Sequence, residues 1–130
     1  MRPVIGVDFG TTNSVVAALG PDGGATVLRH GTDDVFRSVL CFRRGVRGQP
    51  EHAAGPRAIE AYLDDPFDSR LIMSMKSYLA QRSFTETRIL GQAWGLEALV
   101  ALFLRELLAP LADRLGPGAP ARVTVGRPVH

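Results

Sequence analysis

The sequence predicts a mixed α/β fold, in which the sheet begins with an antiparallel meander of three strands and helices pack against that sheet. Three short apolar segments, rich in β-branched residues and separated by tight glycine-containing turns, indicate the meander: Val4–Phe9, Ser14–Leu19 and Ala25–His30. Farther along the chain, Leu96–Leu115 repeats apolar residues at helical spacing. With 130 residues, the chain is long enough to bury the core of one such domain.

The first strand is nearly continuous in apolar residues, which is typical of a strand covered on both faces. The turn Gly10–Asn13 joins it to the second strand, and Gly20–Gly24, which contains Pro-Asp-Gly, forms the next tight turn. We then expect a strand over Ser38–Phe42 and a polar connection over Arg43–His52.

A first helix is predicted to begin at Pro56 and to stop before Pro66, with Asp64-Asp65 in the turn at its end. Its apolar face is formed by Ala58, Ile59, Tyr62 and Leu63. The segment Arg70–Arg82 is predicted to enter in an extended conformation and to form a short helix near Lys76.

The clearest helix covers Leu96–Leu115, where one stripe contains Leu96, Leu99, Val100, Phe103, Leu107, Leu111 and Leu115. Pro110 lacks the N–H for a helical hydrogen bond, so a kink or a break into two helices is expected there. Ala121–Val125 is predicted to be a final buried strand, and Trp94 and Phe103 are expected to be packing residues. Because a buried strand so near His130 has no later element to cover it, we expect this sequence to be a fragment.

Composition and charge favour a cytoplasmic protein that binds neither nucleic acid nor membrane. The net charge is only +2 and no dense basic run occurs. The longest apolar run, Ala98–Leu104, is too short to span a bilayer. The single Cys41 excludes an intramolecular disulfide and is expected to be a small buried residue. The three histidines are far apart in the sequence, without metal-ligand spacing, so no zinc or catalytic histidine site is expected: His30, His52 and His130.

The turn after the first strand contains the residues that are the best candidates for binding a ligand. The residues Gly10, Thr11, Thr12 and Asn13 would point several N–H groups and two hydroxyls in one direction, which suits a phosphate. Asp8 would repel that phosphate unless a hydrated Mg²⁺ lay between them. The alternative is a plain hairpin in which Asp8 caps the turn. Neither a P-loop nor a G-x-G-x-x-G motif is present.

These residues resemble a known family. "IGVDFGTTNSVVA", Ile5–Ala17, is similar to the first phosphate-binding motif of the DnaK-type heat-shock chaperones, which belong to the actin-like ATPase superfamily with sugar kinases and actin. Sugar kinases commonly place a basic residue where this sequence continues with Ser14-Val15-Val16. "RLIMSMKSYLA" resembles the block that carries the family's active-site lysine, here Lys76, and "ARVTVGRPVH" resembles the strand that closes the first lobe. In ordinary DnaK-type chaperones this strand has a Val-Pro-Ala-Tyr-like ending, whereas here it reads Val-Gly-Arg-Pro. This difference, together with "AYLDDP", resembles the divergent YegD-type branch.

The resemblance implies the first lobe of an actin-like ATPase (ribonuclease H-like) fold. Residues 1–38 and 93–130 would form its base, and residues 39–92 an inserted smaller subdomain. The implied cofactors are ATP or ADP and Mg²⁺. Asp8 would face the Mg²⁺ through water, Gly10 to Asn13 would contact the β and γ phosphates, and Lys76 would reach the γ phosphate and the attacking water.

By the same resemblance, the full-length protein would be an ATP-hydrolysing molecular chaperone whose partners are client polypeptides and co-chaperones. A small-molecule (sugar) kinase of the same fold and a non-hydrolysing nucleotide-binding scaffold are the alternatives. The 130 residues alone are expected to bind ATP weakly or undetectably and to lack turnover. The alternative for Lys76 is a solvated surface charge, and the role of Arg127-Pro128 is open.

Overall fold

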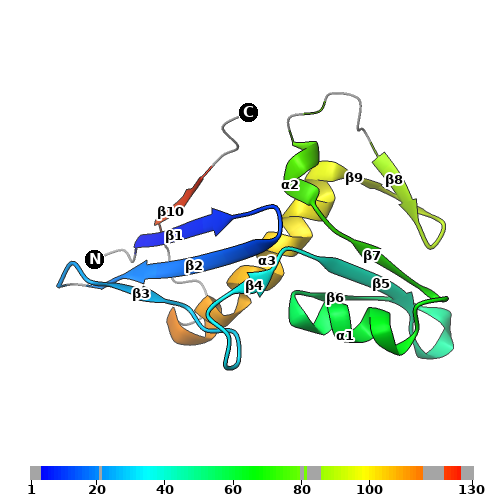
Figure 1. Ribbon diagram of the computed structural model, residues 1–130, viewed down its shortest axis with the longest axis horizontal. Helices are drawn as coiled ribbons and strands as arrows, with labels where there is room; N and C mark the ends of the chain where they lie inside the picture. The colour runs from blue at the N-terminus through cyan, green and yellow to red at the C-terminus, as the bar shows by residue number, and fades with distance from the viewer. Residues whose placement is uncertain (1–3, 21, 80, 82–85, 116–121, 127–130) are drawn as a thin grey trace.

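A computed structural model describes residues 4–20, 22–79, 81, 86–115 and 122–126, without the side chains of 112–115. These residues form a mixed α/β structure, as the sequence predicted. Figure 1 shows two main sheets side by side, with a long helix crossing between them. The larger sheet has the order β10-β1-β2-β3, and a short strand, β4, pairs with β2. Its strands are β1 (Val4–Phe9), β2 (Asn13–Leu19), β3 (Ala25–Val27), β4 (Phe36–Arg37) and β10 (Arg122–Val125).

The predicted meander is confirmed, because β1 pairs antiparallel with β2 and β2 pairs antiparallel with β3, although the third strand, predicted over Ala25–His30, ends at Val27. β10 is parallel to β1. The expectation that β1 is covered on both faces is wrong for the described residues. Ile5, Val7 and Phe9 are buried, whereas Gly6 and Asp8 between them are exposed. Side chains alternate across a strand, and the described helices cover one face of this sheet.

β10 forms as predicted but is not buried. All four of its residues are exposed, including Val123 at 44% and Val125 at 46%. The strand lies at the edge of the described sheet, next to β1 alone. One strand neighbour and an open face therefore leave its apolar side chains in contact with solvent.

The second sheet has the order β6-β5-β7, from β5 (Leu40–Arg44), β6 (Pro50–Ala54) and β7 (Ser69–Ile72). The expected strand over Ser38–Phe42 begins two residues later, since Ser38 donates its N–H to the Thr12 carbonyl at 2.8 Å. The polar connection predicted for Arg43–His52 is wrong, because most of it forms a hairpin. Its turn contains a 3₁₀ segment, Val46–Gly48, and its second strand is β6.

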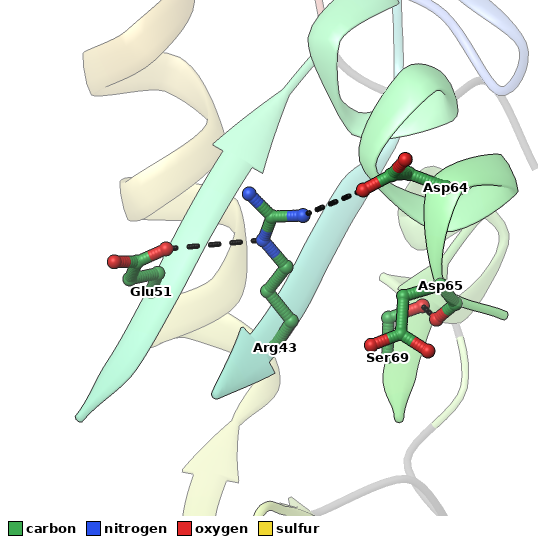
Figure 2. Close-up of polar contacts among 5 residues, drawn as sticks. All are labelled: Arg43, Glu51, Asp64, Asp65 and Ser69. Atoms are coloured by element: carbon green, nitrogen blue, oxygen red, sulfur yellow. Dashed lines mark hydrogen bonds and ion pairs between the residues drawn. The ribbon is translucent and has the colours of Figure 1, made fainter. Parts of the chain in front are cut away.

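Helix α1 (Pro56–Asp64) covers this second sheet and begins at Pro56, as predicted. Ala58 is fully buried there, but Leu63 is 70% exposed, so its placement on the apolar face is wrong. The predicted turn at Asp64-Asp65 is confirmed: the Asp65 N–H bonds to the Ala61 carbonyl at 3.3 Å. Figure 2 shows the polar contacts around this turn. Arg43 lies 3.8 Å from Glu51 and 3.6 Å from Asp64, and the Ser69 hydroxyl donates to the Asp65 carbonyl at 2.6 Å.

The long helix α3 (Leu96–Leu115) forms the core with both sheets. Phe103 is fully buried, with its ring centroid 5.6 Å from that of Phe9 and 5.7 Å from that of Phe36. Four residues of the predicted stripe are buried, namely Leu99, Phe103, Leu107 and Leu111, together with Leu102. The Leu115 side chain lies outside the described residues. Of the two outcomes predicted at Pro110, a kink or a break into two helices, the break does not occur, because one helix continues through the proline. Buried leucines on either side of the proline hold both halves against the same core.

Two smaller elements complete the described chain. A short helix, α2 (Met75–Tyr78), follows β7, as predicted for the segment around Lys76. β8 (Glu86–Ile89) and β9 (Gln92–Gly95) form a hairpin, and Trp94 packs with its ring centroid 5.1 Å from that of Phe42. Trp94 and Phe103 are therefore packing residues, as expected. None of the helices in the described ranges is long and apolar enough to cross a membrane.

Candidate functional site

The turn between β1 and β2 requires glycine at its first position. The Gly10 N–H donates to the Asn13 carbonyl at 3.0 Å, which closes the turn. A Cβ atom on Gly10 would lie 2.2 Å from that carbonyl oxygen, far inside van der Waals contact. The sequence therefore folds into this tight turn because residue 10 has no side chain.

Below the turn, two buried serines hold it against the rest of the fold. The hydroxyls of Ser14 and Ser38 lie 2.7 Å apart, and both residues are fully buried. The Ser38 N–H also bonds to the Thr12 carbonyl at 2.8 Å. Sequence reasoning missed this pair, although a serine begins each of the apolar runs Ser14–Leu19 and Ser38–Phe42.

The tip of the turn presents hydrogen-bond donors to solvent. Thr11, Thr12 and Asn13 are exposed. Within the described chain, neither threonine donates its N–H or hydroxyl to a protein acceptor. Adjacent donors without partners are the kind of surface at which proteins can bind anions. The turn thus places Gly10, Thr11, Thr12 and Asn13 together, as the phosphate hypothesis requires.

Asp8 lies next to this turn, on the open face of the large sheet. Its carboxylate accepts no hydrogen bond from the described residues, so capping of the turn by Asp8 does not occur. An open groove of about 350 Å³ runs beside it, lined by Gly6, Val7, Asp8, Val15, Ala17, Thr124 and Gly126. The Gly126 N–H donates to the Val7 carbonyl at 3.2 Å, which places Gly126 beside Asp8. Sequence reasoning missed Gly6, Thr124 and Gly126, although the period-two alternation of Gly6 and Asp8 was visible in β1.

One exposed carboxylate is compatible with Mg²⁺, which is usually held by one or two carboxylates while it keeps several waters. Within the described ranges, no group of three or more His, Cys, Asp or Glu side chains is arranged to hold a metal by itself. Asp8 as the one carboxylate ligand therefore fits a hydrated Mg²⁺ that is also bound by a phosphate. It does not fit a metal ion whose ligands all come from the protein.

Lys76 lies on α2, a separate element from the turn. Ser74, two residues earlier, has a left-handed backbone (φ 59°, ψ 34°), an uncommon conformation for a residue other than glycine. Met75 is 1% exposed and anchors the short helix, while Lys76 is half-buried and makes no ion pair with a described carboxylate. Lys76 is also the only lysine among the 15 lysine and arginine residues of the sequence.

The same helix supports both parts of the site. Phe9, at the end of β1, packs on Phe103 of α3. Met75 lines a cavity of about 180 Å³ together with Leu99, which lies one helical turn before Phe103. Successive turns are about 5.4 Å apart along a helix. The β1–β2 turn and α2 are thus supported by neighbouring helical turns of α3. The structure does not bring Lys76 into direct contact with Asp8.

Cys41 is 1% exposed, as expected, and burial raises the pKa of its thiol above the ordinary value. His30 and His52, far apart in sequence, line one cleft in the structure. Arg127-Pro128 and His130 lie outside the described residues.

No protein-family model matches the sequence.

Proposed function

We propose that this chain is the N-terminal lobe of an ATP-binding and ATP-hydrolysing molecular chaperone of the DnaK-like family, with an actin-like ATPase fold. The observation that carries the proposal is the turn at Gly10, where a Cβ would clash with the Asn13 carbonyl at 2.2 Å. That turn presents the unpartnered donors of Thr11 and Thr12 beside an exposed Asp8. Phosphate and a hydrated divalent cation are the chemical groups that such a combination would bind.

Each residue has a role that suits its environment. The absence of a side chain at Gly10 lets the backbone approach a phosphate closely. The N–H groups and hydroxyls of Thr11 and Thr12 would hold phosphate oxygens, and Asp8 would bind the water shell of Mg²⁺. When bound, Mg-ATP supplies the phosphoryl group for transfer. Lys76, held by the buried Met75, would neutralise charge on the terminal phosphate, since phosphoryl transfer depends mainly on positioning and charge stabilisation.

We expect only weak ATP binding by these 130 residues. A charge-assisted hydrogen bond contributes about 1.5–3 kcal/mol, and the groups described here line one side of a nucleotide. Calorimetry with Mg-ATP measures the affinity directly. Micromolar binding by this chain would contradict the expectation and would show that the turn and Asp8 suffice.

The decisive experiment is a Lys76→Ala change in the full-length protein. We expect the turnover number for ATP hydrolysis to fall about 100-fold or more, as when one preorganised charge-stabilising donor is removed. Ser77→Ala is the matched control, because Ser77 is exposed on the same short helix and should leave turnover unchanged. Unchanged turnover in Lys76→Ala would reject the catalytic role and leave Lys76 as a surface charge.

The same assay separates the other functions of this fold. Full-length protein that binds Mg-ATP and releases no phosphate would be a nucleotide-binding scaffold. Phosphate transfer to a sugar in place of water would identify a small-molecule kinase. Stimulation of phosphate release by an unfolded polypeptide is the result expected of a chaperone.

A further inference from the structure

Ser74, between β7 and α2, has a left-handed backbone that no hairpin turn accounts for. Among the described residues, three besides the glycines have a positive φ: Arg47 at 70°, Ser74 at 59° and Leu90 at 52°. Arg47 and Leu90 each precede a glycine in the turn of a β-hairpin, where positive φ values are common. Ser74 instead joins a strand to a helix, so its conformation needs another explanation.

The side chain of Ser74 does not compensate for this conformation. The left-handed region is unfavourable for a residue with a Cβ atom, and asparagine or aspartate tolerates it best because its side chain bonds locally. The Ser74 hydroxyl forms no capping hydrogen bond with α2. A residue in such a conformation persists only where the surrounding structure holds it, and these residues gather at functional sites. The segments on either side of Ser74 must therefore impose its conformation.

Both of these segments are anchored. Ile72 ends β7, where it pairs with Leu40 of β5 and packs against the core. Met75, directly after the bend, is 1% exposed and belongs to the same core. The Ser74 carbonyl accepts the N–H of Ser77 at 3.0 Å, which closes the first turn of α2. Ser74 thus turns the chain between two anchored side chains, so that β7 leads directly into a helix beside α3 (Figure 1).

This bend also sets the direction of Lys76. With 3.6 residues per turn, successive side chains of a helix are about 100° apart, so the burial of Met75 determines where Lys76 leaves α2. Helix α2 has four residues, too few to be stable by itself. Its orientation therefore depends on the bend before it. A different φ at Ser74 would rotate α2 relative to β7 and turn Lys76 with it.

We propose that Ser74 is a positioning residue, whose left-handed backbone fixes the direction in which Lys76 points. This role rests on the proposed function, in which Lys76 neutralises charge on the terminal phosphate. Such stabilisation requires preorganised geometry, and a displacement of about 1 Å can slow a reaction about 100-fold. Ser74 acts through its backbone, and its hydroxyl is dispensable.

Four substitutions separate the backbone of Ser74 from its hydroxyl. Ser74→Gly and Ser74→Asn remove the hydroxyl but tolerate the left-handed conformation. Ser74→Thr keeps the hydroxyl and Ser74→Val lacks it, and both introduce a β-branched residue, which strongly disfavours a positive φ. We expect the glycine and asparagine variants of the full-length protein to keep the wild-type kcat for ATP hydrolysis. The threonine and valine variants should lose about tenfold or more. KM for ATP should change less than kcat, because the charge of Lys76 acts mainly in the transition state.

A second measurement does not depend on turnover. Because Lys76 is the only lysine, reductive ¹³C-methylation of the 130-residue chain labels its amine and the N-terminal amine, and NMR follows the Lys76 methyl resonance. We expect this resonance to keep its wild-type position in Ser74→Gly and Ser74→Asn. In Ser74→Thr and Ser74→Val it should move toward its position in the urea-unfolded chain. Circular dichroism checks that each variant is folded, and Ser74→Ala, a milder change, replaces any variant that is not.

Arg47→Gly and Arg47→Val are the matched controls. Arg47 has the same left-handed backbone, but it follows the end of β5 opposite to the one that pairs with Ile72. The same substitutions there should change neither kcat nor the Lys76 resonance. An equal effect of Arg47→Val and Ser74→Val would overturn the proposal, because general destabilisation would then explain both.

The proposed function and the role of Ser74 fail in different experiments. If Lys76→Ala leaves turnover unchanged, the catalytic role of Lys76 is rejected, and the methyl resonance in Ser74→Val then supports positioning by moving or overturns it by staying in place. If Lys76→Ala slows turnover and Ser74→Val does not, Lys76 keeps its role and Ser74 loses the one proposed here. Retained turnover in Ser74→Thr with loss in Ser74→Gly would also overturn the proposal, since the hydroxyl would then be the active group.

Discussion

Replacement of Gly10 by alanine tests whether the turn has the geometry on which the phosphate hypothesis depends. The new Cβ would lie 2.2 Å from the Asn13 carbonyl oxygen, so the backbone must shift and the 3.0 Å hydrogen bond between Gly10 and Asn13 must lengthen or break. Overpacking costs about 1–3 kcal/mol and a lost hydrogen bond about 0.5–1.5 kcal/mol. We therefore expect the free energy of unfolding to fall by about 2–4 kcal/mol.

The assay is urea unfolding followed by circular dichroism, with Gly6→Ala as the control. With a denaturant slope of about 2 kcal/mol/M, the Gly10→Ala midpoint should fall by about 1–2 M. Gly6 lies in β1, the strand that leads into this turn, and a Cβ there meets nothing within 4 Å. Gly6→Ala should therefore be neutral or stabilising by about 0.5–1 kcal/mol, since glycine weakens a strand interior. Equal midpoints for the two variants would refute the reasoning.

Two further predictions concern buried groups outside the binding surface. Ser38→Ala leaves the buried Ser14 hydroxyl without its partner at 2.7 Å and should destabilise by about 1–3 kcal/mol, while the double alanine variant should lose less than the sum of the single changes in a denaturation cycle. Burial raises the pKa of Cys41 above its reference of 9.0, so the folded state holds a proton that the unfolded state loses. Stability should fall as pH rises above about 9, and the fall should be smaller in Cys41→Ala, as measured by urea midpoints between pH 7 and 10. An identical pH dependence in the two proteins would rule out this contribution.

The elements that sequence analysis placed correctly are those specified by local signals. β1 and β2 follow from β-branched runs around a glycine turn, and α3 follows from a stripe of leucines at helical spacing. The start of α1 at Pro56 was predicted correctly, because proline fits the first turn of a helix. These signals depend on residues close together in the chain, so no tertiary information was needed.

The errors arise where distant segments decide the structure. Pro50–Ala54 begins with proline and contains Glu51 and His52, yet it forms the edge strand β6 because all five of its residues pair antiparallel with β5. The burial of β10 was predicted from its apolar residues, but exposure depends on what covers the sheet. Helix α3 is not divided at Pro110, which excludes one of the two predicted outcomes, because the leucines on either side pack into one core.

The candidate site was only partly accessible to sequence reasoning for the same reason. The turn Gly10–Asn13 and Asp8 are contiguous, so their proximity follows from the sequence. The Ser14–Ser38 hydroxyl pair and the position of Gly126 beside Asp8 depend on contacts between distant segments. Likewise, the shared support of Lys76 and the turn by α3 depends on the packing of Met75 and Phe103.

The error about β1 also changes how Asp8 should be understood. A carboxylate at the end of a strand covered on both faces would need a buried partner, because an unpaired charge in the core is strongly unfavourable. Among the residues that the structure describes, Asp8 has no such partner, and it needs none there, since its side chain lies on an exposed face of the sheet. An exposed carboxylate close to the unpartnered N–H groups of Thr11 and Thr12 keeps its hydration and stays accessible to a charged ligand. The alternation in β1 therefore divides its side chains between two faces: Ile5, Val7 and Phe9 pack into the core, and Gly6 and Asp8 lie on the exposed face, where the proposed ligand would bind.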